Sequence, residues 1–92
     1  MSNEIQRAMK IVNEKGLHAR ASAKFVEVVE AYDAKAWVSK DGTKTGGDSI
    51  MGLLMLAAAR GSTIEVRTEG PQAVELADAL EALLADRFGE EY

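Results

Sequence analysis

The chain has 92 residues, of which 47% are apolar, and a formal net charge of −4. This length suits one compact domain with a small core and leaves little room for a deep active-site cleft. Because there is no cysteine, disulfides and thiolate metal sites are excluded. An acidic chain with five aromatic residues also lacks the positive field and the stacking surface of a nucleic-acid-binding protein, so we expect no nucleic-acid partner.

The sequence has no membrane-spanning segment, which would need roughly 18 to 20 apolar residues. Its longest apolar stretch, residues 53–59, is far too short. The first residues lack the basic region and the apolar run of a secretory signal. We therefore expect a cytoplasmic protein without membrane insertion, folded as a single domain over residues 1–92.

The first elements in the chain are a predicted strand and a predicted helix. Residues 5–12 contain an alternation of apolar and polar positions that indicates an edge or half-buried strand, and residues 13–16 are typical of a turn. Apolar residues at helical spacing then predict an amphipathic helix over residues 19–31. Its expected core positions are Ala21, Phe25, Val28 and Val29.

A hairpin is predicted next. Residues 34–40 form its first strand and residues 43–46 its return strand. The Asp41-Gly42 pair between them is a strong hairpin signal, because both central positions of a type I′ turn favour residues that tolerate positive φ.

A short helix is predicted to begin at Ser49, whose hydroxyl can accept an unpaired backbone N–H. The apolar run over residues 50–56 cannot all face inward on one helix, so we expect Leu53 and Leu56 in the core and an exposed apolar patch beside them. Gly52 costs up to about 1 kcal/mol relative to alanine inside a helix, so something other than helix propensity favours it.

The last two elements are a strand and a helix. Strict alternation over residues 63–69 predicts a strand with Ile64, Val66 and Thr68 facing inward. Gly70-Pro71 opens the final helix, with Gly89 expected just past its end at the C′ position. The expected core stripe of this helix is Val74, Ala77, Leu80, Leu83 and Leu84.

The resulting order is β-α-β-β-α-β-α. It predicts the α+β class, with a four-stranded antiparallel sheet and three helices on one face, which is an open-faced sandwich.

The only histidine, His18, is the strongest candidate for chemistry. A lone histidine in a small domain is more often structural or merely exposed, but His18 follows a glycine turn and stands where a helix begins. A helix N-terminus presents unpaired amides and positive potential, which together bind anions such as phosphate. Arg20 adds a permanently charged donor group, although an arginine at this position can also be an ordinary surface residue. A neutral imidazole is a nucleophile, so a phosphoryl group can form on a ring nitrogen of His18.

Two motifs resemble those of the HPr family, the histidine-containing phosphocarriers of the phosphoenolpyruvate-dependent phosphotransferase system. Residues 16–20, Gly-Leu-His-Ala-Arg, resemble the active-site signature, and residues 48–53, Asp-Ser-Ile-Met-Gly-Leu, resemble the regulatory serine motif. The motifs stand in the expected order, and the resemblance covers nearly the whole chain. It implies an HPr-like fold and a phosphoryl carrier rather than an enzyme.

The resemblance also implies roles for individual residues. His18 would accept a phosphoryl group on Nδ1 from phosphoenolpyruvate-charged enzyme I and donate it to an enzyme IIA-type domain. Arg20 would stabilise that group, and Ser49 would be phosphorylated by an ATP-dependent HPr kinase. We expect a monomer that needs no cofactor and no metal. The implied partner-docking residues are Ala19, Ile50, Met51, Leu54 and Met55.

Some alternatives remain open at this point. Ser49 can be an N-cap without being modified, and the phosphorelay can serve sugar transport or a nitrogen-related regulatory branch. HPr proteins usually carry proline after the motif arginine, whereas this chain has Ala21, which restores an N–H in the first turn. A regulatory module that binds a partner without phosphotransfer is a second hypothesis. A metal-dependent or hydrolytic enzyme is a third, disfavoured because one histidine and no cysteine supply few ligands.

Overall fold

The computed structural model describes residues 3–92 and has the predicted order of elements. The strands are β1 (Glu4–Lys10), β2 (Lys35–Lys40), β3 (Thr43–Gly46) and β4 (Thr63–Glu69). The helices are α1 (Ala19–Glu30), α2 (Ile50–Met55) and α3 (Ala73–Ala85), and a 3₁₀ turn, Arg87–Gly89, follows α3. Within residues 3–92, no helix combines the length and the apolar character needed to cross a bilayer.

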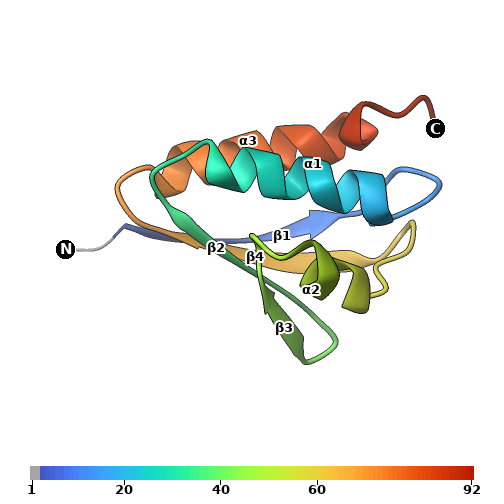
Figure 1. The fold of residues 1–92 in the computed structure, drawn as a ribbon, viewed down its shortest axis with the longest axis horizontal. Helices are drawn as coiled ribbons and strands as arrows, with labels where there is room; N and C mark the ends of the chain where they lie inside the picture. Colours follow the sequence, from blue (N-terminus) through green and yellow to red (C-terminus); the bar gives the residue numbers. More distant parts are fainter. Residues whose placement is uncertain (1–2) are drawn as a thin grey trace.

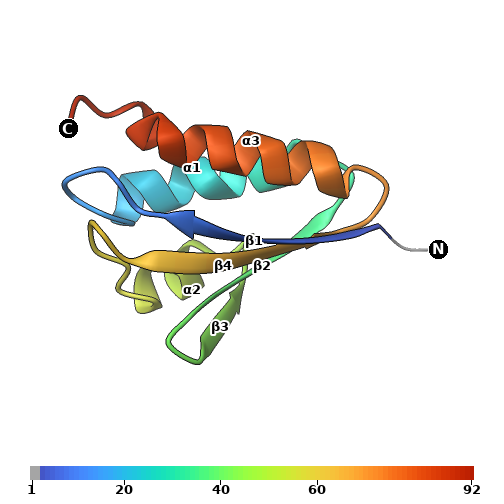
Figure 2. The ribbon, with the colours of Figure 1, turned by 180° about the vertical axis from the view of Figure 1, so that it is seen from behind.

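The strands form one antiparallel sheet in the order β1-β4-β2-β3. The two views in Figures 1 and 2 show α1 and α3 running side by side along this sheet. Inward residues of the sheet share one core with side chains from all three helices, so the helices cover a single face. On the open face, the Arg67 guanidinium lies 4.4 Å from the centre of the Trp37 ring. The predicted α+β open-faced sandwich is confirmed.

The core matches the predicted inward positions in most places. Leu53 and Leu56 are buried, as expected from the apolar run, whereas Val28 of α1 is half-buried against the core. Thr68 is fully buried, and its hydroxyl donates a hydrogen bond to the Ala73 carbonyl at 2.7 Å. That bond satisfies the one polar group that β4 points inward and ties the strand to the first turn of α3.

Two tight backbone features explain residues that the sequence singled out. Asp41 and Gly42 have φ of 50° and 83°, so the predicted hairpin turn with positive φ at both positions is confirmed. At Gly52, a Cβ atom would lie 1.8 Å from the Thr45 hydroxyl oxygen. Glycine therefore stands within α2 because this helix packs directly on β3, and that contact outweighs the weak helix propensity.

Three predictions for the C-terminal helix are wrong. Pro71 is not in its first turn, because α3 begins at Ala73 after the N-cap Gln72. Val74 is 43% exposed, because the buried stripe of α3 runs through Ala73, Leu76, Ala77, Leu80 and Leu84 instead. Gly89 is not the C′ residue of α3. The helix ends with Asp86 as its C-cap, and the next residue, Arg87, takes the left-handed conformation with φ of 55°. The chain leaves α3 early because this turn carries Phe88 into the core, where it is fully buried.

Candidate functional site at the start of α1

The loop before α1 holds its last residues in a fixed position. Gly16 has φ of 68°, and a Cβ atom there would lie 2.6 Å from the Ala58 carbonyl oxygen. The Leu17 amide donates to the same carbonyl at 2.9 Å, and the Leu17 side chain is buried. Close packing against the segment after α2 thus requires glycine at position 16 and delivers the next residue, His18, to the head of the helix.

His18 is the N-cap residue of α1. Its backbone is extended, with φ of −78° and ψ of −176°, and its carbonyl accepts a hydrogen bond from the Ser22 amide at 2.8 Å. Its side chain does not cap the helix and is 29% exposed. Within residues 3–92, no acceptor pairs with the amides of residues 19–21. The predicted arrangement, an accessible imidazole at a helix start with free amides, is present.

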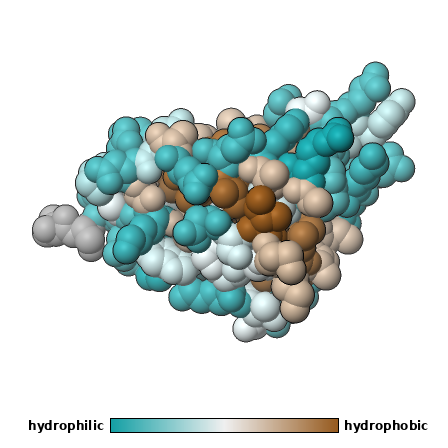
Figure 3. Space-filling model, viewed as in Figure 1, coloured by the Kyte–Doolittle hydropathy of each residue, from teal (hydrophilic) through white to brown (hydrophobic). Residues whose placement is uncertain are grey.

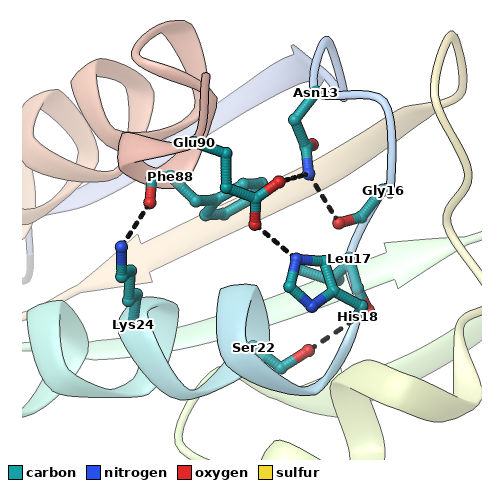
Figure 4. Close-up of polar contacts among 8 residues, drawn as sticks. All are labelled: Asn13, Gly16, Leu17, His18, Ser22, Lys24, Phe88 and Glu90. Carbon is teal, nitrogen blue, oxygen red and sulfur yellow. Dashed lines mark hydrogen bonds and ion pairs between the residues drawn. The ribbon is translucent and has the colours of Figure 1, made fainter. Parts of the chain in front are cut away.

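A residue of the C-terminal segment, after α3, holds the imidazole ring in place. Its Nε2 is hydrogen-bonded to the Glu90 carboxylate, and Glu90 also accepts a hydrogen bond of 2.9 Å from the buried Asn13 amide group. Figure 4 shows the other ring nitrogen, Nδ1, pointing away from Glu90 toward the side where α1 begins. Among the residues that the structure describes, none forms a hydrogen bond with Nδ1.

Glu90 is charged in this setting. Burial opposes ionisation of its carboxyl group, but hydrogen bonds from Asn13 and His18, together with electrostatic attraction to His18 and Lys15, lower the pKa of Glu90 below its ordinary value. A carboxylate beside Nε2 favours the tautomer of the neutral ring that carries its proton on that nitrogen.

Arg20 lies two residues after His18, exposed in the first turn of α1. Its guanidinium forms no hydrogen bond or ion pair with any residue that the structure describes, so it is not committed to another partner. Next to the ring lies a shallow hollow of about 190 Å³, lined by His18, Leu17, Lys15 and residues 57–59. This hollow gives a small anion room beside the imidazole.

The second motif lies on α2, which packs against α1. Ser49 is the N-cap of α2, because its hydroxyl accepts a hydrogen bond from the Gly52 amide at 3.0 Å. The helix turns Met51 and Met55 outward, with 70% and 74% of their surfaces exposed. Ile50, Leu54 and Ala19 are exposed as well. Figure 3 shows the apolar atoms gathered over α2, which is the exposed patch predicted from the run.

Asn13 and Glu90 are the residues of this site that the sequence did not reveal. The contact between Glu90 and His18 spans 72 residues, so no local pattern could predict it. A weak signal was available in Phe88, a large apolar residue in a segment rich in charged side chains, whose burial brings the C-terminal segment back to the core. In the described part of the chain, no group of His, Asp and Glu side chains is arranged to hold a metal ion.

Comparisons with known proteins agree with this geometry. Residues 5–86 match the family model described as the PTS HPr component phosphorylation site. The phosphocarrier protein HPr of Cupriavidus necator is 46% identical over 86 residues, which cover 94% of this chain and 97% of that protein. The phosphocarrier protein NPr of Klebsiella oxytoca is 38% identical over 88 residues, or 95% of this chain and 98% of that protein.

The solved structures include one with nearly the same fold. The crystal structure of HPr-C-His from Thermoanaerobacter tengcongensis superposes with a TM-score of 0.90 at 35% identity, covering 96% of this chain and 99% of that one. The match extends over nearly the whole of both chains. The chain therefore belongs to the HPr family, the phosphocarrier proteins of the phosphotransferase system.

Proposed function

We propose that this phosphocarrier takes a phosphoryl group from phosphoenolpyruvate-charged enzyme I on Nδ1 of His18 and passes it to an enzyme IIA-type domain. The observation that carries the proposal is the position of His18 at the head of α1. The ring is accessible there, and the first-turn amides have no acceptor among the residues that the structure describes. An oxyanion bound to Nδ1 would meet these donors and the positive end of the helix.

The test is phosphorylation followed by intact-mass measurement. Incubation with phosphoenolpyruvate, Mg²⁺ and an active cognate enzyme I should add the mass of one phosphoryl group, and mild acid should remove it. The gain should be absent in His18→Ala. A protein that gains no mass under these conditions, or gains it equally in His18→Ala, would contradict the proposal.

Arg20 has the role of a phosphate-stabilising residue in this proposal. It is exposed beside His18 and free of other ion pairs within the described chain, so its guanidinium can turn toward a bound phosphoryl group. A guanidinium forms paired hydrogen bonds to phosphate oxygens, and its charge persists at any physiological pH.

The partners would dock on the apolar surface of α2 together with Ala19. The exposed methionine side chains there are flexible and adapt to differently shaped surfaces, as a carrier that meets a donor and an acceptor requires. Because docking needs this surface free, we propose that the protein works as a monomer in the cytoplasm. Separate transfer assays with IIA domains of the sugar-transport and nitrogen-related branches would identify the acceptor.

Ser49 is the proposed regulatory site, phosphorylated by an HPr kinase. It caps α2 at the edge of the proposed docking surface, where a phosphate would add negative charge without opposing the helix dipole. Inhibition would then come from repulsion of partners rather than from unfolding. ATP-dependent labelling with HPr kinase should occur in the wild type and disappear in Ser49→Ala, and a label retained in that variant would assign the site elsewhere.

A further inference from the structure

A hollow of about 480 Å³ lies at one edge of the sheet, beside the end of α1 and the beginning of β2. Strand β3 runs beside β2 only as far as the pair Trp37 and Gly46, so within residues 3–92 no strand covers the first residues of β2 on that side. The hollow next to His18 measures about 190 Å³, less than half of this volume. A space of about 480 Å³ is large enough to enclose a small organic molecule.

Small residues and two aromatic rings shape this hollow. Ala34, Ala36 and Gly46 line it and leave its space open, and the aromatic residues are Tyr32 and Trp37. Both aromatic side chains are half-buried, so each ring keeps a part of its surface for a ligand. A hollow with this lining offers π surfaces for stacking, as well as room for methyl or methylene groups.

Arg67 fixes the orientation of the Trp37 ring. Its guanidinium lies 4.4 Å from the ring centre and also pairs with the Glu4 carboxylate at 3.0 Å. Arg67 lines a separate hollow on the open face of the sheet and does not line the larger one, so the larger hollow meets a part of the ring that Arg67 leaves uncovered. Because Glu4 offsets the charge of Arg67, the ring is held with little repulsion toward a second cation.

The polar side chains around the hollow are not committed to other partners. Within residues 3–92, none of them forms a side-chain hydrogen bond or ion pair; they are Glu30, Tyr32, Lys35, Trp37 and Asp48. The Asp48 carboxylate lies close to Gly46, where a Cβ atom would come within 2.7 Å of its oxygen. Polar groups that could each hold a ligand therefore surround one space.

The charges around the hollow favour a cation. Glu30 is the last residue of α1, where the helix dipole adds negative potential and the last turn has no basic residue. Asp48 contributes a second carboxylate from the loop before α2. Lys35 is the positively charged residue of the lining, and its cross-strand neighbour on β4 is Glu69, which offsets its charge. A cation here would meet two carboxylates and the rings that organic ammonium groups bind in proteins.

We infer that this hollow is a binding site for a small organic cation, an alkylammonium or quaternary ammonium compound. Its apolar part would pack on Tyr32 and Trp37, and its charge would face Glu30 and Asp48. The site lies at the opposite end of α1 from His18, which caps the beginning of that helix, so the inference does not rest on the proposed phosphoryl transfer. It gives α1 two charge-selective ends, with an anion at the positive end of its dipole and a cation at the negative end.

Fluorescence tests the site, because Trp37 is the only tryptophan of the chain. The protein is titrated with tetramethylammonium chloride and, separately, with putrescine dihydrochloride. Each should change the emission in a saturable way that sodium chloride at the same ionic strength does not reproduce. The uncharged analogue tert-butanol, similar in size to tetramethylammonium, should bind about 5-fold more weakly or not at all. No saturable change with either cation, or equal binding of tert-butanol, would overturn the inference.

Substitutions around the hollow identify the groups that bind the cation. Glu30→Gln and Asp48→Asn, both at exposed positions, should each weaken tetramethylammonium binding about 5-fold, and Tyr32→Leu should have a similar effect because it removes a ring. The matched control Glu27→Gln changes an exposed carboxylate one turn earlier on α1, outside the lining, and should bind like the wild type. Thermal unfolding is checked for each variant. Equal weakening in the control and in both carboxylate variants would show an effect of net charge alone and overturn the inference.

Backbone ¹H–¹⁵N spectra locate the bound cation independently. Tetramethylammonium should shift the amides of residues 30–37 and 46–48 and leave those of α3 in place, although α3 exposes Glu75, Asp78 and Glu81. Shifts concentrated on α3 would mean attraction to a general acidic surface and would contradict the assigned site. These spectra need no enzyme I, so their result stands whether or not His18 is phosphorylated.

Discussion

At the start of α2, the Ser49 hydroxyl accepts a hydrogen bond from the Gly52 amide, so the helix satisfies part of its own N-terminus. At the start of α1, His18 occupies the same cap position, but its side chain turns to Glu90, and the first-turn amides find no partner within residues 3–92. Serine is a favoured cap and stabilises a helix by about 1 kcal/mol relative to alanine. One helix start therefore satisfies part of its own hydrogen-bonding capacity, whereas the other leaves that capacity available, as the proposed phosphoryl binding requires.

The missing side-chain cap at the start of α1 lowers the stability of this helix, and packing along the rest of the helix compensates for that loss. Phe25 and Val29 lie in the core, and Lys24 holds the C-terminal segment that in turn holds His18. Most helix stability in a folded protein comes from packing of the apolar face, so the uncapped end is tolerated. His18 thus lies at the end of α1 where backbone amides lack partners within the described chain, while the rest of the helix is well packed.

The largest expected effect comes from the guanidinium of Arg20 in the first turn of α1. Arg20→Ala should lower the rate of phosphoryl transfer about 100-fold, as expected for removal of one preorganised donor to a developing oxyanion. Assays with enzyme I and a IIA domain, quenched at successive times, measure this rate. The transfer rate of Arg20→Lys, which keeps the charge but not the paired donors, should lie between those of the wild type and Arg20→Ala. Transfer at the wild-type rate in Arg20→Ala would remove Arg20 from the site.

The next effect concerns the packing that positions α2. Gly52→Ala should destabilise the protein by about 2 kcal/mol, because the new methyl group would overlap the Thr45 side chain. Denaturant unfolding of the variant and the wild type gives the difference. Thr45→Ala in the same chain should restore part of it by removing the closest clashing atom. An unchanged free energy of unfolding in Gly52→Ala would show that α2 can shift away from β3 freely.

The two helix starts can be compared directly with the same pair of residues. At position 49, the wild type should be more stable than Ser49→Ala by about 1 kcal/mol. At position 18, His18→Ser should be more stable than His18→Ala by a similar amount. Equilibrium unfolding measures both differences. A gain at position 49 with none at position 18 would mean that the amides at the head of α1 are already satisfied.

The smallest effect is a dependence of stability on pH through Glu90. Because hydrogen bonds and nearby charge lower the pKa of Glu90 in the folded protein, despite burial, its contribution to stability is fully present above its ordinary value of about 4.3. The contribution is lost as the pH falls through the lowered pKa. The difference in unfolding free energy between the wild type and Glu90→Gln should therefore shrink on acidification. A difference that grows instead would contradict the lowered pKa.

Elements with strong local signals could be predicted closely from the sequence. Strict alternation gave the bounds of β4, and the Asp41-Gly42 turn gave the hairpin, because both signals depend only on neighbouring residues. In α3 the apolar residues are so dense that several stripes fit, and Val74 was assigned inward when it is exposed. When apolar residues are this dense in a helix, tertiary packing decides which of them face the core.

The candidate site divides in the same way. His18, Arg20 and Ser49 could be found because their motifs are contiguous, and each stands at a helix start. Asn13 and Glu90 could not be found, since they meet only after the burial of Phe88 turns the chain back. A contact between residues far apart in the sequence produces no local periodicity or motif spacing from which it could be predicted.

The proposed function depends most on the amides at the head of α1 binding the phosphoryl group on His18. Backbone ¹H–¹⁵N spectra recorded before and after phosphorylation test this directly. We predict that the amides of residues 19–21 shift strongly downfield as they gain an anionic acceptor, while the Gly52 amide, already bonded to Ser49, does not move. Phosphorylated protein in which the amides of residues 19–21 stay unshifted would contradict the central claim.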